Sequence, residues 1–163
     1  MLFRRYRAEY TDQCIDLIPI HIEPPAKALE FGREQVWSIT MHDKRREIGQ
    51  ISYRTGESRA VYYYGHIGYH IDAPYRGHHY AMRACRLLQK EILMSGKRSV
   101  VITCDPDNAP SRKTCQHLGC LLEGTVNVPE RLQKDFDLSA VKCRYIWIIG
   151  ENGEKNEMFD RRR

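Results

Sequence analysis

The sequence predicts a mixed α/β (α+β) fold in which helices flank a sheet of about seven strands. Two patterns predict it: consecutive β-rich runs in the first half of the chain, and apolar strands that alternate with helical patterns in the second half. The length of 163 residues, with 42% hydrophobic and 29% charged residues, suits one globular domain. We therefore expect a single domain over residues 1–150 and a polar tail over residues 151–163.

The amino-terminal half is expected to contain one helix among strands. Residues 1–7, "MLFRRYR", are typical of an edge strand. Residues 11–22 begin with a Thr or Asp cap and carry apolar residues at roughly helical spacing, which predicts a helix. Residues 23–34 contain two prolines and are expected to form a loop with a short helix. Residues 35–42 and 47–55 are β-rich runs joined by the charged turn "DKRR", which predicts a hairpin.

A strand, a helix and a second strand are expected in the middle of the chain. Residues 60–71, "AVYYYGHIGYHI", are rich in aromatic and β-branched residues. Apolar residues at helical spacing follow over 78–94, and Gly96 ends that helix. Residues 99–104, "SVVITC", form an apolar run typical of a buried strand. A strand, helix and strand of this length form a βαβ unit with parallel strands.

A second helix and two further strands complete the prediction. Asp107 or Asn108 caps the helix, Pro110 lies in its first turn, where the missing N–H is harmless, and Gly119 ends it. Residues 120–128 and 142–149 are then expected to be strands.

The composition narrows the function classes. The chain has no apolar run of about 18 residues, so we expect no membrane partner and a cytoplasmic location. Six cysteines without a C-x-x-C pair suggest reduced thiols that mostly fill the core, and no metal site. The net charge of +5 suits a phosphate-bearing ligand or a nucleic acid without requiring either.

The junction "DAPYRGHHYAMRA" at residues 72–84 connects a predicted strand to a predicted helix. The first turn of a helix offers unpaired N–H groups and the positive end of the helix dipole, so it favours an anion. Gly77 lets the backbone approach a ligand closely, and Arg76 adds a cation that suits phosphate. The junction contains neither a Walker loop nor a Rossmann turn.

The stretch "HIGYHIDAPYRGHHYAMRACRLL" resembles the acetyl-CoA signature of the GNAT superfamily of N-acyltransferases, Q/R-x-x-G-x-G/A after "xxGYxIxPxYRG". Arg76 takes the first position of that signature and Ala81 the last. "NAPSRKTCQHLGCLLEG" is similar to the "NxxSxRxxxxxGFxxEG" segment of ribosomal-protein and small-molecule acetyltransferases in the superfamily. The residues that match this second segment are Asn108, Ser111, Gly119, Glu123 and Gly124.

The resemblance implies the GNAT acyl-CoA N-acyltransferase fold, a mainly antiparallel sheet with a splayed parallel pair at its centre. It also implies direct transfer of an acetyl group from acetyl-CoA to a primary amine, without a metal. The pantetheine arm would lie between the strands at 60–71 and 99–104. The implied coenzyme contacts are the backbone of Ile71, Asp72 and Ala73, the Arg76 side chain, the amides of Gly77, His78, His79, Tyr80 and Ala81, and Asn108 and Ser111 of the next helix.

Two departures from the family pattern affect the expected site. His79 stands at the fourth position of the signature, which is normally glycine, so its ring must point away from the pyrophosphate or contact it. The tyrosine that many members use as a general acid would fall near Cys115. Ser111 is then the candidate donor to the departing thiolate, although a hydroxyl is a poor acid and a plain coenzyme contact or helix-turn hydroxyl stays open. Cys115 as an acyl-carrying nucleophile has no activating partner visible in the sequence.

His66 and His70 are the candidate general bases, because an unperturbed imidazole has a pKa of roughly 6.5. With Gly68 they alternate along one face of the predicted strand, so the two rings share a side. For either residue, a hydrogen bond that serves only the structure is an open alternative.

Other function classes and the acceptor stay open. A catalytically silent acetyl-CoA-binding domain is the main alternative, and a basic nucleic-acid-binding module is disfavoured because the basic residues are spread along the chain. The acceptor cleft is expected between "IPIHIEPPAKALEFGREQ" and "PERLQKDFDLSAV", which carry mixed charges rather than an acidic trough. A small-molecule amine and a protein N-terminal α-amine both fit, and the protein is expected to be a monomer or a homodimer.

Overall fold

The computed structural model describes residues 7–20 and 28–150. In this part of the chain an eight-stranded sheet runs in the order β1-β2-β3-β4-β5-β6-β8-β7. The register pairs are antiparallel between all neighbours except β5 and β6, which are parallel. The predicted mixed sheet with one parallel pair is confirmed, with one strand more than expected.

The elements have the following bounds. The strands are β1 (Tyr10–Thr11), β2 (Ile15–Ile20), β3 (Glu34–Met41), β4 (Arg46–Arg54), β5 (Ile67–Ile71), β6 (Ser99–Cys104), β7 (Leu121–Asn127) and β8 (Val141–Ile148). The helices are α1 (Arg59–Tyr64), α2 (Tyr80–Leu87), α3 (Gln89–Met94), α4 (Ala109–His117) and α5 (Glu130–Phe136), with 3-10 helices η1 (Ala28–Phe31) and η2 (Ala73–Tyr75).

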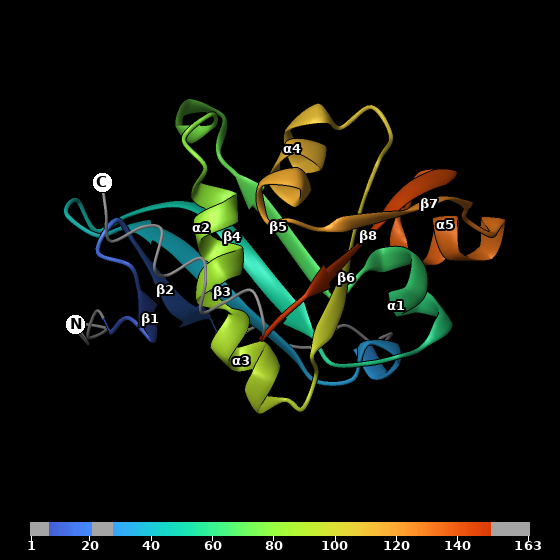
Figure 1. Cartoon of the computed structure of the whole chain (residues 1–163), viewed down its shortest axis with the longest axis horizontal. Helices are drawn as coiled ribbons and strands as arrows, with labels where there is room; N and C mark the ends of the chain where they lie inside the picture. The colour runs from blue at the N-terminus through green and yellow to red at the C-terminus, as the bar shows by residue number, and fades with distance from the viewer. Residues whose placement is uncertain (1–6, 21–27, 151–163) are drawn as a thin grey trace.

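The two faces of the sheet pack against different helices. On one face, strand residues such as Trp37 and Tyr145 form the main core with Ala84, Leu88 and other residues of α2, α3 and α4. On the other face, a smaller cluster joins η1, α1 and the last residue of α5. In Figure 1, α2 and α3 cross in front of the sheet, and α1 and α5 lie together at its right-hand end. A ligand between the strands therefore meets different helices on the two faces.

The prediction of a helix over residues 11–22 is wrong, because Ile15 to Ile20 form strand β2. Ile15 and Leu17 are both fully buried, which is the two-residue period of a strand. Pro19 would cost about 3 kcal/mol inside a helix. In β2 its nitrogen faces away from β3, so no bond of that ladder is lost.

The prediction of one continuous strand over residues 60–71 is wrong in its first half, which is helix α1. Ser58 caps this helix, since its Oγ accepts the N–H of Val61 at 3.3 Å. Ala60 and Val61 are buried against the smaller cluster, so tertiary packing outweighs the β-propensity of the tyrosines. Gly65, with a φ of 85°, ends the helix before β5 begins.

The remaining predictions are confirmed where the structure describes them. The hairpin is β3–β4, the helix over 78–94 is α2 and α3, the helix after Asn108 is α4, and the short helix in 23–34 is η1. The last three predicted strands are β6, β7 and β8. Helix α5 was not expected. The predicted edge strand over residues 1–7, apart from Arg7, and the tail over residues 151–163 lie outside the described residues.

We expect Leu88→Ala to lower the free energy of unfolding by about 2–5 kcal/mol, because this residue links α2 to α3, its side chain is fully buried in the main core, and its removal leaves a cavity. Leu93→Ala is the matched control, since that side chain is 44% exposed and its loss should cost about 0.5 kcal/mol or less. Urea unfolding of the two variants measures both values. Equal losses would contradict the packing described above.

Candidate active site

Strands β5 and β6 separate soon after they meet. Within the described chain their one register pair is Ile67 with Ile102. The N–H of Asp72 donates to a β4 carbonyl, which fixes the alternation along β5: even-numbered residues bond to β4 and odd-numbered residues face β6. The backbone groups of Tyr69 and Ile71 therefore face the gap between the two strands.

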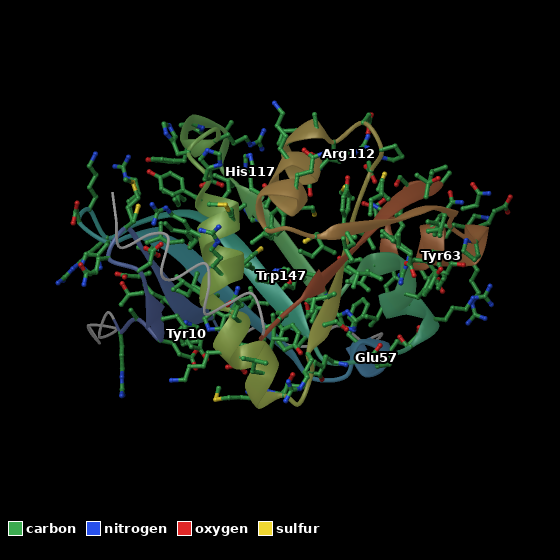
Figure 2. The ribbon with its side chains drawn as sticks, in the orientation of Figure 1. Tyr10, Glu57, Tyr63, Arg112, His117 and Trp147 are labelled. Atoms are coloured by element: carbon green, nitrogen blue, oxygen red, sulfur yellow. The ribbon has the colours of Figure 1, made fainter. Side chains whose placement is uncertain are left out.

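His66 closes the narrow end of this gap. Its backbone N–H donates to the carbonyl of Val101 at 2.8 Å, and its Nδ1 accepts the N–H of Val101 at 2.9 Å. Its Nε2 lies 3.0 Å from Oε1 of Glu57, which is labelled in Figure 2. Burial lowers the pKa of the ring, which favours the neutral form that these contacts require.

The gap opens into a cavity of about 350 Å³. Residues of β5 and β6, Asn108 and Ser111 of α4, and Phe136–Leu138 at the end of α5 line it. The cavity therefore passes through the sheet, from the α4 face to the face covered by α1 and α5.

Two hydroxyl groups meet in this cavity. The phenol oxygen of Tyr69 lies 2.9 Å from Oγ of Ser111, and either group can donate. Ser111 is 8% exposed, and its N–H donates to Oδ1 of Asn108, the cap of α4, at 3.2 Å. Burial raises the pKa of Tyr69, so the phenol keeps its proton at neutral pH. Arg112, labelled in Figure 2, fixes α4 by donating to the hydroxyl of Tyr145 and the carbonyl of Pro106, both at 3.1 Å.

The strand β5 leads from the gap to a turn before α2. Gly77 adopts a φ of 85° in this turn, with open space around the position of a Cβ. The Nε of Arg76 donates to the carbonyl of Ile71 at 2.8 Å, which leaves the outer nitrogens of the guanidinium toward solvent. Helix α2 then begins without a side-chain cap, so its first N–H groups remain available to an anion.

A comparison with known families identifies the fold. A family model described as an acetyltransferase (GNAT) domain matches residues 6–121, which is more than half of the chain. The chain belongs to the GNAT acetyltransferase family. The resemblance seen in the sequence is confirmed.

Solved structures of other acetyltransferases share this fold. The ribosomal-protein-S5-alanine acetyltransferase from Vibrio fischeri is 19% identical over 72% of this chain and 63% of its own, with a TM-score of 0.55. The microcin C7 self-immunity acetyltransferase, in complex with acetyl-CoA and AMP, is 27% identical over 71% and 61%, with a TM-score of 0.54. An acetyltransferase from Agrobacterium tumefaciens is 14% identical over 86% and 92%, with a TM-score of 0.58.

The chain spans less than two thirds of the length of the first two of these proteins. A search of curated proteins finds no match to it.

In this GNAT chain, His79 occupies the fourth position of the signature, which is normally glycine. It adopts a left-handed conformation, with a φ of 62°, at the residue that caps α2. Glycine takes this conformation without steric cost, whereas histidine takes it with some strain. The ring of His79 lies 4.9 Å from that of His117, which is labelled in Figure 2.

Cys115, near the family's usual tyrosine, points into the core. It is fully buried and its pKa is raised by a hydrogen bond with Cys120 and by burial, which favours the unreactive thiol. Burial also raises the pKa of Cys104, at the cavity wall, to about 11. The cavity therefore offers a GNAT reaction hydroxyl groups rather than a thiolate.

The two candidate bases are placed differently from the expectation. Both nitrogens of His66 are occupied by hydrogen bonds at the closed end of the gap, so this ring has no free lone pair for an amine. The side chain of His70 is 61% exposed, with Nε2 3.8 Å from Oδ1 of Asp72, and His70 does not line the cavity. The structure does not bring the two rings together at one acceptor.

The other predicted coenzyme residues lie along the β5–α2 connection. Asp72 uses its N–H in the β4 ladder, and its neighbour Ala73 starts η2. The ring of His78 lies 5.7 Å from that of Tyr80, and Tyr80 packs against the main core. Ala81 is 9% exposed on α2. The turn therefore keeps Arg76 to His79 at the surface and uses the next two residues for packing.

The carboxylate of Glu123, in the second motif, has a structural contact. Glu123 Oε2 accepts from Nε of Arg144 at 2.7 Å, and that guanidinium carbon lies 3.5 Å from the ring centroid of Tyr62. This pair ties β7 and β8 to α1. It lies outside the cavity lining.

Some cavity residues were missed by sequence analysis. Tyr69 was assigned to the strand, but its contact with Ser111 depends on which strand face meets α4. Asp105, at the end of β6, accepts from Nζ of Lys142 at 2.6 Å and from Oγ of Ser139 at 2.5 Å. These hydrogen bonds, the one from Lys142 most of all, lower the pKa of the Asp105 carboxyl group. The only sequence signal for Asp105 as a cavity residue was its position directly after an apolar strand.

Within the described ranges, no three or more His, Cys, Asp or Glu side chains are grouped as metal ligands. None of the described helices combines the length and apolar character needed to span a membrane.

We expect His66 to make stability depend on pH. Burial holds its pKa below the ordinary value of 6.5, so the unfolded chain binds the proton more readily than the folded protein. The contribution of the neutral ring is complete above pH 6.5 and is lost as the pH falls below that value. His66→Gln should remove this part of the dependence in urea unfolding measured across that range.

His42→Gln is the control of opposite sign. A hydrogen bond to Asp16 raises the pKa of His42, so its contribution is present below pH 6.5 and is lost as the pH rises through the raised value. A wild-type profile that His66→Gln leaves unchanged would contradict the role of His66 described above.

Proposed function

We propose that this protein transfers an acetyl group from acetyl-CoA to a primary amine. The observation that carries the proposal is the continuity between the gap and the turn: the cavity between β5 and β6 leads along β5 to an uncapped helix start behind Gly77. A long, thin ligand with an anionic end fits this shape. Acetyl-CoA, which was seen with one structurally similar acetyltransferase, has that form.

The coenzyme would use backbone groups along its length. The pantetheine amides would pair with Tyr69 and Ile71, whose N–H and C=O groups lack a strand partner in the gap, and Arg76 would release the Ile71 carbonyl that it holds in the free protein. This revises the expected stretch by two residues, since the N–H of Asp72 is already bonded to β4. The pyrophosphate would lie at the amides that follow Gly77, with the outer nitrogens of Arg76 beside it.

The reaction needs an attack, a stabilised oxyanion and a protonated leaving group. The neutral amine attacks the thioester carbonyl carbon, and a backbone N–H in the gap stabilises the oxyanion. The C–N bond forms as the C–S bond breaks, and the hydroxyl of Ser111 donates its proton to the thiolate of coenzyme A and regains one from solvent. The amine loses its proton to solvent, through the open mouth of the cavity.

Tyr69 would act through Ser111. Its phenol is too buried to ionise readily, so its O–H donates to Oγ of Ser111 and turns the serine proton toward the sulfur. The phenol on β5 thereby compensates for the tyrosine that α4 lacks. Tyr69 is in this sense a positioning residue, and Ser111 is the catalytic one.

We expect Gly77→Val to weaken binding of acetyl-CoA by about tenfold or more, because a β-branched residue resists the left-handed φ and would shift the amides of the turn. Gly96→Val is the matched control: Gly96 has nearly the same φ, 86°, and equally open surroundings, but lies after α3. Calorimetric titration with acetyl-CoA, coenzyme A and dephosphorylated pantetheine measures the binding.

Both valine variants should lose similar stability, and only Gly77→Val should lose affinity. Wild-type protein that is folded but binds neither acetyl-CoA nor coenzyme A would rule out the proposed function.

We expect Ser111→Ala to lower kcat by about 10²–10⁴-fold, the usual contribution of a general acid. Tyr69→Phe should lower kcat by about tenfold with little change in KM for acetyl-CoA, because one hydrogen bond to the serine is lost. The double variant should be no slower than Ser111→Ala, since the phenol acts through the serine. Release of free thiol measures the three rates. Additive losses in the double variant would show that Tyr69 does not act through Ser111.

A further inference from the structure

The cavity has two chemically different ends. Tyr69 and Ser111 lie on the face of the sheet that packs against α2 and α4, where the turn at Gly77 also leads. Oγ1 of Thr103 lies on the other face, 3.0 Å from the carbonyl oxygens of Tyr63 and Tyr64 at the end of α1. A coenzyme that enters along the turn therefore leaves the α1–α5 end to the acceptor.

Aromatic rings form one wall of the α1–α5 end. Tyr64 and Phe136 line the cavity, with ring centroids 6.2 Å apart, and Phe31 packs behind both at 5.0 and 5.2 Å. The guanidinium of Arg54 lies 4.4 Å from the ring of Tyr64, and Glu34 balances its charge at 3.2 Å. Such a wall favours an apolar or aromatic body and tolerates an ammonium group.

One carboxylate at this end has no counter-ion. Asp137 lines the cavity, and its side chain has no hydrogen-bond or ion-pair partner among residues 7–20 and 28–150. Its backbone is fixed in the left-handed region, with a φ of 52°, as its N–H donates to the carbonyl of Gln133. The other carboxylate of the lining, Asp105, is neutralised by Lys142. The described lining therefore carries one net negative charge.

From these contacts we infer the acceptor class, in an inference that rests on the proposed acetyl transfer. The acceptor is a small monoamine on an aromatic or apolar body, without a carboxylate beside the amine. Asp137 binds its ammonium form, which loses one proton to solvent before the neutral amine attacks, and the wall of Tyr64 and Phe136 holds its body. The volume of about 350 Å³ is shared with the thioester end of the coenzyme, which leaves room for a body of roughly one ring.

The experiment compares phenethylamine with phenylalanine, which have the same ring and amine and differ by one carboxylate. In the wild type, kcat/KM for phenethylamine should exceed that for phenylalanine by about tenfold or more, because Asp137 attracts the first and repels the carboxylate of the second. Asp137→Asn should lower kcat/KM for phenethylamine by about tenfold and leave that for phenylalanine unchanged or higher. Asparagine suits the left-handed φ, so the backbone should keep its conformation.

Glu130→Gln is the matched control. It removes a carboxylate from the start of the same helix, outside the cavity lining, and should leave kcat/KM unchanged for both phenethylamine and phenylalanine. Calorimetry should give the same affinity for acetyl-CoA in wild type and both variants.

The outcomes separate the two proposals. Equal use of phenethylamine and phenylalanine, or equal effects of Asp137→Asn on both, would overturn the acceptor class and leave acetyl transfer standing. A short peptide with a free α-amine that is acetylated with a higher kcat/KM than phenethylamine would overturn it as well. Protein that binds acetyl-CoA and acetylates none of these amines would overturn the acceptor class, whereas folded protein that binds neither acetyl-CoA nor coenzyme A would overturn the proposed function.

Discussion

The separation of β5 from β6 is the constraint on which the site depends. Two parallel strands that part after one register pair leave N–H and C=O groups without partners, which is costly inside a sheet unless another group takes their place. The chain satisfies the closed end of the gap with the backbone and ring of His66. The open end leaves backbone groups of Tyr69 and Ile71 without a strand partner, and the proposed site residues are arranged along it.

The helices on the two faces of the sheet contribute different side chains to the cavity. The α4 face supplies the hydroxyl of Ser111, the cap that orients it and the arginine that holds the helix on the sheet. The opposite face supplies rings and a carboxylate from α1 and α5, which enter the cavity only because the gap passes through the sheet. In the proposed function, catalysis depends on one face and selection of the acceptor on the other, so the two can vary separately.

Much of the fold followed from sequence patterns, and the exceptions have physical causes. The stripe of Ala81, Ala84, Leu88 and Ile92 predicted a buried helix face, and all four side chains are buried. The first helix prediction failed because a short apolar run fits both periods, and Pro19 was the neglected signal against a helix. The strand prediction for the tyrosine run was wrong because its conformation depends on the burial of Ala60 and Val61, which is a long-range effect.

The candidate site was predictable where it depends on local chemistry. A left-handed turn before a helix could be inferred from Gly77, and the cap of α4 from Asn108. The partner of Ser111 could not, because the contact with Tyr69 joins residues 42 positions apart and depends on strand register. Likewise, His66 and His70 share a strand face, but burial and hydrogen bonding give them different environments that spacing alone does not encode.

The hydrogen bond from Arg76 to Ile71 has a consequence for the free protein. The side chain occupies the carbonyl that a pantetheine amide would otherwise need, and in doing so it keeps the turn in shape. In the proposed coenzyme site, Arg76 would take the place of part of the pantetheine arm in the free protein, so the turn would be ordered before the coenzyme binds and its ordering would not reduce the affinity. When the pantetheine arm binds, one of its amides would replace Arg76 at the carbonyl of Ile71, and the freed guanidinium would contact the phosphates. Binding of the pantetheine and of the pyrophosphate would therefore be coupled through the side chain of Arg76.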